Sequence, residues 1–260
     1  MGLLDGRRAL IFGVANDHSI AWGIARALHA HGATVGFSSL ESLLERRVRP
    51  LAASIGSTFV EPCDVRSDDD IRRVVEKWRD AYGELDVLVH ALAFARREDL
   101  DGSFLDTSRD GFALALDVSA YSLVALAREA RPLLRPGSSV ITLTYYGAEK
   151  VVEHYNVMGV AKAALEASVR YLAADLGPSG VRVNAISAGP VRTLAASGIA
   201  GFRKMYGAFA DVAPLRSSIS IDDVAGAAVY LASDLSRQVT GETIYVDGGF
   251  NILGMPAIED

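Results

Sequence analysis

The stretch YYGAEKVVEHYNVMGVAK, residues 145–162, joins a short apolar run to an amphipathic helical pattern. Tyr155 precedes Lys162 by seven residues, and seven residues at about 100° each turn a helix almost twice. The spacing therefore predicts a phenol and an ammonium on one helix face, about 10 Å apart along the axis. Tyr145 adds a second phenol directly after the apolar run 139–144. We predict that these three side chains line one wall of a pocket.

The pair formed by Tyr155 and Lys162 also indicates a chemistry. An unperturbed tyrosine has a pKa of about 10, and a nearby cation favours the phenolate or at least strengthens the phenol as a hydrogen-bond donor. The alternative is an amphipathic helix whose lysine extends to solvent, because Tyr-x6-Lys alone is common. Position favours the catalytic interpretation, since the pair occupies the helix after the fifth strand of a dinucleotide-binding pattern.

Outward from this stretch, apolar runs and helical patterns alternate along the whole chain. The strand-like runs are 9–12, 34–38, 58–60, 85–91, 139–144, 181–186 and 243–246, and the helical patterns are 20–32, 40–53, 69–82, 109–134, 155–176 and 222–231. Such alternation predicts an α/β fold: one Rossmann-like domain over residues 1–260, with a doubly wound parallel sheet of about seven strands and helices on both faces. The one long irregular stretch, 187–212, is predicted to form a substrate flap over the end of the sheet.

Composition argues against several classes of protein. Half of the 260 residues are apolar, and the net charge of −6 arises from interspersed acids and bases, which argues against a nucleic-acid surface. Cys63 is the only cysteine, so no disulfide forms within the chain, and a cytoplasmic location fits this. No charge-free stretch reaches 18 apolar residues, so we predict no membrane span. The five histidines do not cluster at metal-ligand spacings, so we predict no metal site.

The loop after the first apolar run carries the pattern Gly13-x5-Ser19-Ile20-Ala21-x-Gly23. This loop opens a helix, whose free N-terminal amides suit a pyrophosphate, while glycine lets the backbone approach closely. The spacing is not G-x-G-x-x-G, and a tight turn from strand to helix explains it as well.

Further candidates lie at the ends of later strands. Asp64 and Val65 follow the third strand, where a carboxylate either accepts from the amine of an adenine or is a surface turn acid. Residues 90–93, HALA, end the fourth strand, and small side chains there allow a cofactor to lie against the strand tip. We interpret His90 as a packed structural histidine, and Cys63 as buried and inert.

On these residues the chain resembles the short-chain dehydrogenases/reductases, and within them the bacterial NADH-dependent enoyl-acyl-carrier-protein reductases. The resemblance spans nearly the whole chain and rests on GVANDHSIAWGIA, CDV, HALAFA, YNVMGVAKAALEASVRYLA, GVRVNAISAGPVRTLAASGI, FRKM and VDGGF. Ordinary short-chain reductases carry Tyr-x3-Lys, whereas here Gly159 stands four residues after Tyr155 and the lysine comes at 162. This displaced spacing, together with Tyr145, is the enoyl-reductase pattern.

The resemblance implies hydride transfer from NADH to the β-carbon of a trans-2-enoyl thioester on acyl carrier protein, the last step of the fatty-acid elongation cycle. It implies that Tyr155 donates a hydrogen bond to the thioester oxygen, that Lys162 holds the nicotinamide ribose, and that Tyr145 guides the acyl chain. Whether Tyr155 or a water relay supplies the proton at the α-carbon stays open. The resemblance also implies cofactor contacts from Gly13, Ser19, Ile20, Leu40, Asp64, Val65, Leu92, Val191, Arg192, Thr193, Leu194 and Ala195, and substrate contacts from Ala95, Phe202, Met205 and Tyr206.

The chain departs from the family pattern at two places. Ala93 stands where the family usually has glycine, which narrows the pocket beside the nicotinamide. The second strand ends at residues 38–40 without an acid for the ribose 2′-hydroxyl; Glu41 comes later, and Arg46 and Arg47 lie further into the helix. We therefore predict that NADH is preferred over NADPH.

Two other functions remain as alternatives: a short-chain reductase acting on a ketone or on another enoyl-CoA, and a non-catalytic nucleotide sensor on the same fold. The missing Tyr-x3-Lys argues against the first, and the presence of Tyr145, Tyr155 and Lys162 argues against the second. The resemblance further implies a homotetramer formed through long helices, and Arg203 with Lys204 is a candidate basic rim for the acidic carrier protein.

Overall fold

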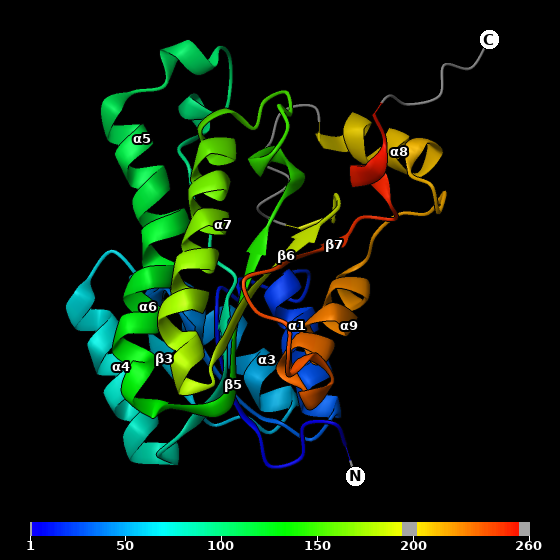
Figure 1. Cartoon of the computed structure of the whole chain (residues 1–260). Helices are drawn as coiled ribbons and strands as arrows, with labels where there is room; N and C mark the ends of the chain where they lie inside the picture. Colours follow the sequence, from blue (N-terminus) through cyan, green and yellow to red (C-terminus); the bar gives the residue numbers. More distant parts are fainter. Residues whose placement is uncertain (1, 194–201, 255–260) are drawn as a thin grey trace.

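The structure is a computed structural model that describes residues 2–193 and 202–254, with the backbone alone for residues 202–205. The described strands form one seven-stranded parallel sheet in the order β3-β2-β1-β4-β5-β6-β7 (Figure 1). They are β1 (Arg8–Phe12), β2 (Thr34–Ser39), β3 (Val60–Pro62), β4 (Leu85–His90), β5 (Leu134–Thr144), β6 (Arg182–Ala188) and β7 (Thr243–Val246). The predicted doubly wound parallel sheet of about seven strands is confirmed.

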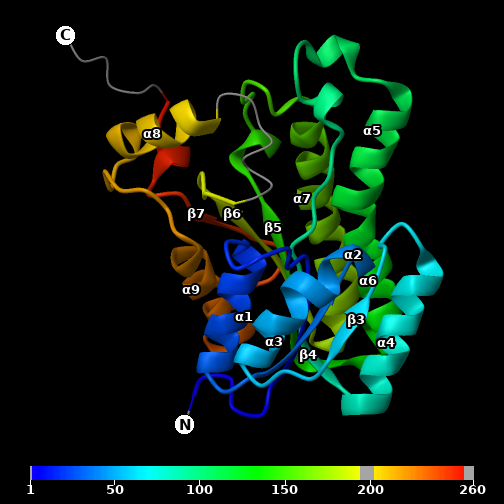
Figure 2. The ribbon, with the colours of Figure 1, turned by 180° about the vertical axis from the view of Figure 1, so that it is seen from behind.

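Helices cover both faces of this sheet (Figures 1 and 2). They are α1 (Ile20–Ala30), α2 (Glu41–Leu43), α3 (Arg49–Ser54), α4 (Asp68–Tyr82), α5 (Arg109–Leu116), α6 (Ser122–Ala130), α7 (Asn156–Leu176), α8 (Phe202–Val212) and α9 (Ile221–Ala232). On one face α1 packs against α9, and α3 continues that layer. On the other face α4, α6 and α7 form the second layer.

β1 illustrates why the sheet is buried on both faces. Ala9 and Ile11 pack into the core beneath α1 and α9, whereas Leu10 and Phe12 pack into the core beneath α4, α6 and α7. Successive side chains of a strand point to opposite faces, so a strand between two helical layers requires an uninterrupted apolar run. Because all strands are parallel, their carboxyl ends meet at one edge, which is where ligands bind in such folds.

The helical pattern predicted over residues 109–134 is divided in the structure. A π-helical turn, η4 (Asp117–Tyr121), separates α5 from α6, and β5 already begins at Leu134. β5 pairs with β4 at Leu134 and again from Ser139, with an irregular register between these points. The irregular part contains Pro136, which has no amide hydrogen to donate to a ladder. The strand therefore starts five residues earlier than the sequence pattern predicted.

One helical stretch among the described residues, Arg109–Leu133, is long and apolar enough to cross a membrane, with a mean hydropathy of 1.4. Half of its most apolar window is buried inside the fold. The α6 part of this stretch places Leu123, Leu126 and Ala130 in the core between the helix and the sheet. A core helix passes the same test of length and composition, so the stretch is weak evidence for a membrane span.

The prediction of an irregular stretch over residues 187–212 is wrong at both ends. β6 continues to Ala188, and α8 covers the last eleven residues. Phe209 on α8 is buried, and its ring centroid lies 5.4 Å from that of Phe250, which follows β7. Such tertiary packing supports a short helix that local propensity alone, with Gly207 at its centre, does not favour.

Candidate active site

Tyr155, Lys162 and Tyr145 come together at the carboxyl end of β5. Tyr155 immediately precedes α7, with φ −94° and ψ −27°, and Lys162 lies within that helix. Asn156 has a φ of +40°, so the predicted continuous helical spacing is interrupted directly after Tyr155. Both side chains are buried, with 8% and 5% of their surface exposed. The Tyr145 ring meets the Tyr155 ring edge to face, with 5.0 Å between centroids. Ala95 packs against the same small cluster.

Two glycines allow this close arrangement. A Cβ atom at Gly147 would lie 2.4 Å from the ring of Tyr155, and one at Gly159 would lie 2.8 Å from the carbonyl oxygen of Gly147. Neither position has room for a side chain. This contact gives a physical reason for the displaced spacing, because a lysine four residues after Tyr155 would collide with the segment that follows β5. Lys162 lies on the neighbouring part of the helix surface, three residues further on.

The electrostatics of the tyrosines correct one expectation. Burial raises the pKa of Tyr155, and neighbouring Tyr145 and Glu166 raise it further. Burial also raises the pKa of Tyr145 to about 12. The phenol is therefore favoured over the phenolate alternative, because the loss of hydration disfavours the anion. A protonated phenol can donate a hydrogen bond, and developing charge on an oxygen would accept one.

Lys162 is held by the backbone of β5. Its Nζ atom donates a hydrogen bond to the carbonyl oxygen of Leu143 at 2.8 Å. Burial lowers the pKa of Lys162 to about 8, and Glu166 opposes this effect. The ammonium is therefore charged at neutral pH, but it loses its proton at a lower pH than an exposed lysine does.

His90, at the end of β4, is confirmed as a structural histidine. Its two ring nitrogens lie 2.8 Å from the hydroxyl oxygens of Thr142 and Ser122. Burial, with a smaller effect from the charge of Lys162, lowers the pKa of His90 to about 3. The neutral ring thus ties β4 to β5 and α6 in the core.

The loop after β1 has the geometry of a phosphate-binding turn. Gly13 has a φ of +106°, and a Cβ atom there would lie 2.1 Å from the carbonyl oxygen of Ala91. Only glycine fits this conformation and this approach. The hydroxyl of Ser19 accepts hydrogen bonds from the amides of residues 15–16 at 3.1 and 3.0 Å, and makes no cap to α1. Ser19 therefore closes the loop, and the first amides of α1, beginning at Ile20, lack a helical acceptor as at any helix N-terminus, which suits an anion.

A cavity of ≈390 Å³ lies where β2 and β3 end. Its lining consists of Leu40, Glu41, Ser42, Pro62, Cys63, Asp64, Asp70 and Arg73. Leu40 and Asp64, both predicted cofactor contacts, thus share one cavity, whereas Val65 is buried in the core beside it. Arg73 donates to Asp70 at 2.7 Å, so this cation is already paired. An apolar wall with an acidic rim fits the adenosine end of a dinucleotide without a 2′-phosphate.

Asp64 and Cys63 are two of the cavity residues whose pKa values are shifted. The hydrogen bond from Arg66 is the main cause that lowers the pKa of Asp64. Burial, followed by the charge of Asp70, raises the pKa of Cys63 to about 12. Cys63 is thus a buried thiol, as the sequence predicted, and its inertness stays a prediction.

The loop after β4 is fixed by the π-helical turn η4. Ser119 of that turn accepts from the amide of Phe94 at 2.9 Å and lies 3.2 Å from its carbonyl oxygen. Leu92 packs against the core beneath α6, and Ala95 packs against the Tyr155 cluster. The turn thereby positions two predicted contacts, and π turns are often found at functional sites. No sequence signal pointed to Ser119.

The predicted contacts after β6 are only partly described. Val191 is buried in the core beneath α1, and the guanidinium of Arg192 lies 4.3 Å from the ring centroid of Tyr206 on α8. Thr193 is half-buried. Leu194 and Ala195 lie outside the described residues, as do the side chains of Phe202 and Met205.

The residues on either side of Tyr155 were missed by the sequence reasoning. His154 and Asn156 have φ values of +62° and +40°, which are rare and costly for residues other than glycine. The side-chain amide of Asn156 donates to the carbonyl oxygens of Leu100 and Gly102 at 3.0 and 3.3 Å. An asparagine beside the tyrosine is a signal that was available, because asparagine tolerates left-handed backbone angles.

These features define a class of protein. A doubly wound parallel sheet, a glycine turn built for phosphate at Gly13, and a buried pair of Tyr155 and Lys162 at the carboxyl edge together define a dinucleotide-dependent short-chain dehydrogenase/reductase.

Comparison with known proteins specifies the class. The sequence model of the family described as Enoyl-(Acyl carrier protein) reductase matches residues 13–251. Enoyl-acyl-carrier-protein reductase (NADH) FabI of Aquifex aeolicus is 51% identical over 256 residues, which are 98% of this chain and 95% of the relative. The protein of the same name from Bacillus cereus is 51% identical over 256 residues, 98% of this chain and all of the relative. The chain belongs to the enoyl-(acyl carrier protein) reductase family.

Solved structures agree with this assignment. The Bacillus cereus enoyl-acyl carrier protein reductase, crystallised with NADP+ and an indole naphthyridinone, superposes with a TM-score of 0.96 at 51% identity, covering 98% of this chain and all of that one. The enoyl-acyl-carrier-protein reductase of Anaplasma phagocytophilum in complex with NAD gives a TM-score of 0.95 at 49% identity, covering 99% and 98%.

Proposed function

We propose that the protein reduces the carbon–carbon double bond of trans-2-enoyl thioesters carried by acyl carrier protein, with hydride from NADH. The observation that carries the proposal is the buried pair of Tyr155 and Lys162, seven residues apart and next to Tyr145. Relatives about half identical over their full lengths are named as NADH-dependent reductases of this substrate.

The residues of the carboxyl edge fit a bound dinucleotide. NADH, when bound, supplies the hydride. Gly13 and the first amides of α1 bind the pyrophosphate, Leu40 and Asp64 line the adenosine cavity, and Lys162 holds the ribose beside the nicotinamide. Further contacts come from Ser19, Ile20, Val65 and Leu92, and from Val191, Arg192, Thr193, Leu194 and Ala195.

Tyr155 acts on the substrate. Reduction at the β-carbon places negative charge on the thioester oxygen, and a protonated, buried phenol stabilises that charge by donating a hydrogen bond. The edge-to-face contact with Tyr145 keeps the phenol ring in place. Tyr145, Ala95, Phe202, Met205 and Tyr206 line the path of the acyl chain, and residues 187–212 form a flap over it.

The test is an assay of NADH oxidation with two thioesters. We expect turnover with crotonyl thioester and none with acetoacetyl thioester. Reduction of the ketone instead would support an ordinary short-chain reductase. NADH binding without turnover of either thioester would support a nucleotide sensor.

NADH is preferred over NADPH in this proposal. The adenosine cavity is lined by Glu41, Asp64 and Asp70, while its cation, Arg73, is paired with Asp70. A 2′-phosphate would add negative charge to an acidic lining. We expect kcat/KM to be higher with NADH, and Asp70→Asn to raise kcat/KM for NADPH by freeing Arg73. Asp69→Asn, which removes an exposed acid of α4, is the matched control. A higher kcat/KM of the unmodified enzyme with NADPH would contradict the preference.

Docking of the acidic carrier protein requires a local basic rim on a chain of net charge −6. Arg203 and Lys204, at the start of α8, are the candidates. Replacing both by glutamate should raise KM for the carrier-bound substrate and leave KM for the CoA thioester unchanged. Equal effects on both substrates would contradict the docking role.

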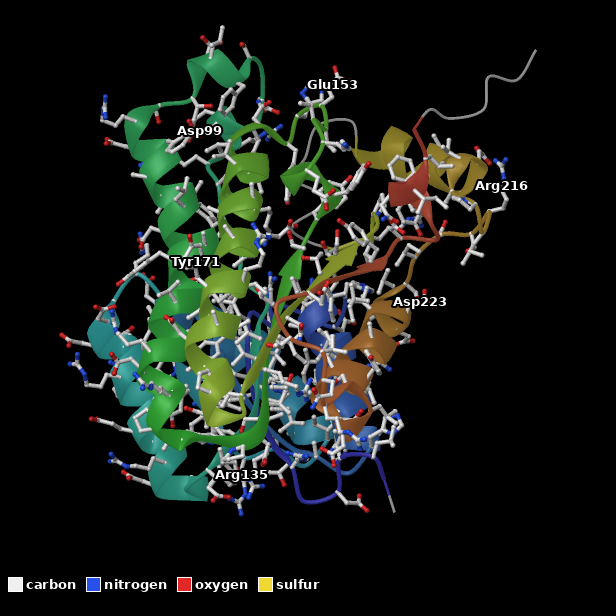
Figure 3. The ribbon with its side chains drawn as sticks, viewed as in Figure 1. Asp99, Arg135, Glu153, Tyr171, Arg216 and Asp223 are labelled. Atoms are coloured by element: carbon white, nitrogen blue, oxygen red, sulfur yellow. The ribbon has the colours of Figure 1, made fainter. Side chains whose placement is uncertain are left out.

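The protein is proposed to act as a cytoplasmic homotetramer. One face of α7 is apolar and exposed at Val160, Ala163, Tyr171 and Ala174, and Figure 3 labels Tyr171 on that helix. Such a stripe suits close packing between helices of two subunits. Light scattering should give four chains per particle, and Ala163→Glu should lower that number. A monomer in the unmodified protein would contradict the tetramer.

A further inference from the structure

Two successive residues at the end of β5 each hold a polar side chain of α7. Lys162 Nζ donates to the carbonyl oxygen of Leu143 at 2.8 Å, and the hydroxyl of Thr144 donates to Glu166 Oε1 at 2.6 Å. Lys162 and Glu166 are four residues apart, so they lie on the same helix face. Both are buried, and 8% of Glu166 is exposed. The end of β5 therefore holds a cation and a carboxylate of the same helix face, each through its own hydrogen bond.

A buried carboxylate is costly unless it is hydrogen-bonded and close to a cation. Burial raises the pKa of Glu166, while Thr144, Arg170 and Lys162 lower it. In return, Glu166 opposes the lowering of the Lys162 pKa by burial. Each member of the pair thus favours the charged form of the other.

The other titratable groups around the pair do not replace Glu166. Burial keeps the phenols of Tyr145 and Tyr155 and the imidazole of His90 neutral near pH 7. Glu149, after β5, disfavours the ionised form of Glu166, and it accepts a hydrogen bond from the hydroxyl of Tyr245 on β7. Arg170, one turn further along α7, favours the ionised form of Glu166.

We propose that Glu166, held by Thr144, is a positioning residue for Lys162: it keeps the lysine ammonium charged at the end of β5, where the lysine binds the cofactor ribose. The inference rests on the proposed function for the role of Lys162. Glu166 does not touch the reacting atoms in this proposal. It sets the alkaline limit of cofactor binding, because a neutral lysine loses the charged hydrogen bond to the ribose.

The experiment measures Kd for NADH by fluorescence between pH 6.5 and 9.5. In the unmodified protein we expect the affinity to fall at alkaline pH, as Lys162 loses its proton. In Glu166→Gln the midpoint of this fall should move down by at least about half a pH unit, since a neutral amide no longer favours the ammonium. Binding at pH 6.5 should stay close to that of the unmodified protein.

Two controls separate this role from a merely structural one. Asp175→Asn removes an exposed acid of the same helix and should leave the midpoint unchanged. Thr144→Val removes the hydroxyl that holds Glu166 and should lower the midpoint, whereas Thr144→Ser should restore it. If Glu166→Gln does not fold, as judged by circular dichroism, the comparison of Thr144→Val with Thr144→Ser tests the proposal instead.

Three results would overturn the inference: a midpoint in Glu166→Gln equal to that of Asp175→Asn, equal midpoints in the two Thr144 variants, or loss of NADH binding already at pH 6.5. Turnover of crotonyl thioester at pH 6.5 tests the proposed function separately. A protein that binds NADH with the expected shift but reduces no enoyl thioester would contradict the function and not the link between Glu166 and Lys162.

Discussion

Tyr155→Phe removes a single hydroxyl from the candidate site and keeps the ring. The ring is buried against Tyr145 with 5.0 Å between centroids, and phenylalanine can make the same edge-to-face contact. The free energy of unfolding should therefore change by less than about 1 kcal/mol. A preorganised donor to a developing oxyanion in a water-excluded site contributes about 2.7–4 kcal/mol to the transition state. We expect kcat to fall about 100- to 1000-fold.

The assay is steady-state NADH oxidation with crotonyl thioester, alongside NADH binding and urea unfolding. Kd for NADH should not change, because Lys162 remains. Since burial raises the pKa of Tyr155, no titration of the phenol should appear in kcat between pH 6 and 9. Tyr171→Phe, at a tyrosine of α7 that is 78% exposed, is the matched control and should leave kcat unchanged. A kcat within threefold of the unmodified value in Tyr155→Phe would refute the assigned role.

Three further predictions concern the fold around the site. Gly159→Ala places a Cβ atom 2.8 Å from the carbonyl oxygen of Gly147 and should lower the free energy of unfolding in urea by about 1–3 kcal/mol. Gly226→Ala in α9 is the control, because a Cβ atom there meets nothing within 4 Å, and it should be neutral or stabilising. Equal effects of the two substitutions would contradict the contact. Burial raises the pKa of Cys63 to about 12, so this thiol should react with a thiol reagent at pH 8 only after unfolding. Fast reaction of the folded protein would show that the thiol is accessible. Burial lowers the pKa of His90 to about 3. Below about pH 6.5 the unfolded chain therefore binds a proton that the folded protein does not. The free energy of unfolding should fall on acidification by up to about 1.4 kcal/mol per pH unit. Urea unfolding at pH 7 and pH 5 should show a larger loss for the unmodified protein than for His90→Gln, and the same loss in both would contradict the assignment.

Much of the fold could be predicted because its signals are local. The alternation of apolar runs with helical patterns is read directly from the sequence, and β7 begins and ends where the pattern of residues 243–246 predicts. The errors come from tertiary contacts. α8 depends on the packing of Phe209 against Phe250, and the early start of β5 at Leu134 depends on pairing with Leu85. Neither partner is near in sequence.

The candidate site divides in the same way. Tyr155, Lys162 and Gly13 belong to spacings that a sequence displays, so they could be named in advance. Thr144 and Glu166 could not, because nothing links a strand residue to a helix residue 22 positions later until the strand and the helix pack together. The protonation state of the Tyr155 phenol was open for a related reason. The charge of a nearby lysine can be read from the sequence, but the extent of burial cannot.

The contact between Gly147 and Gly159 bears on how such enzymes diverge. A reductase with the Tyr-x3-Lys spacing has its lysine three residues nearer to the tyrosine than this protein does. No single amino-acid exchange converts the Tyr-x6-Lys spacing of this protein into that one. A lysine introduced at position 159 would strike the main chain at Gly147. In the proposed function, removing Lys162 first would abolish the hold on the cofactor. Conversion between the two layouts therefore requires the segment after β5 to be rebuilt together with the helix, so an attempt to redesign substrate choice in this protein should begin with that loop.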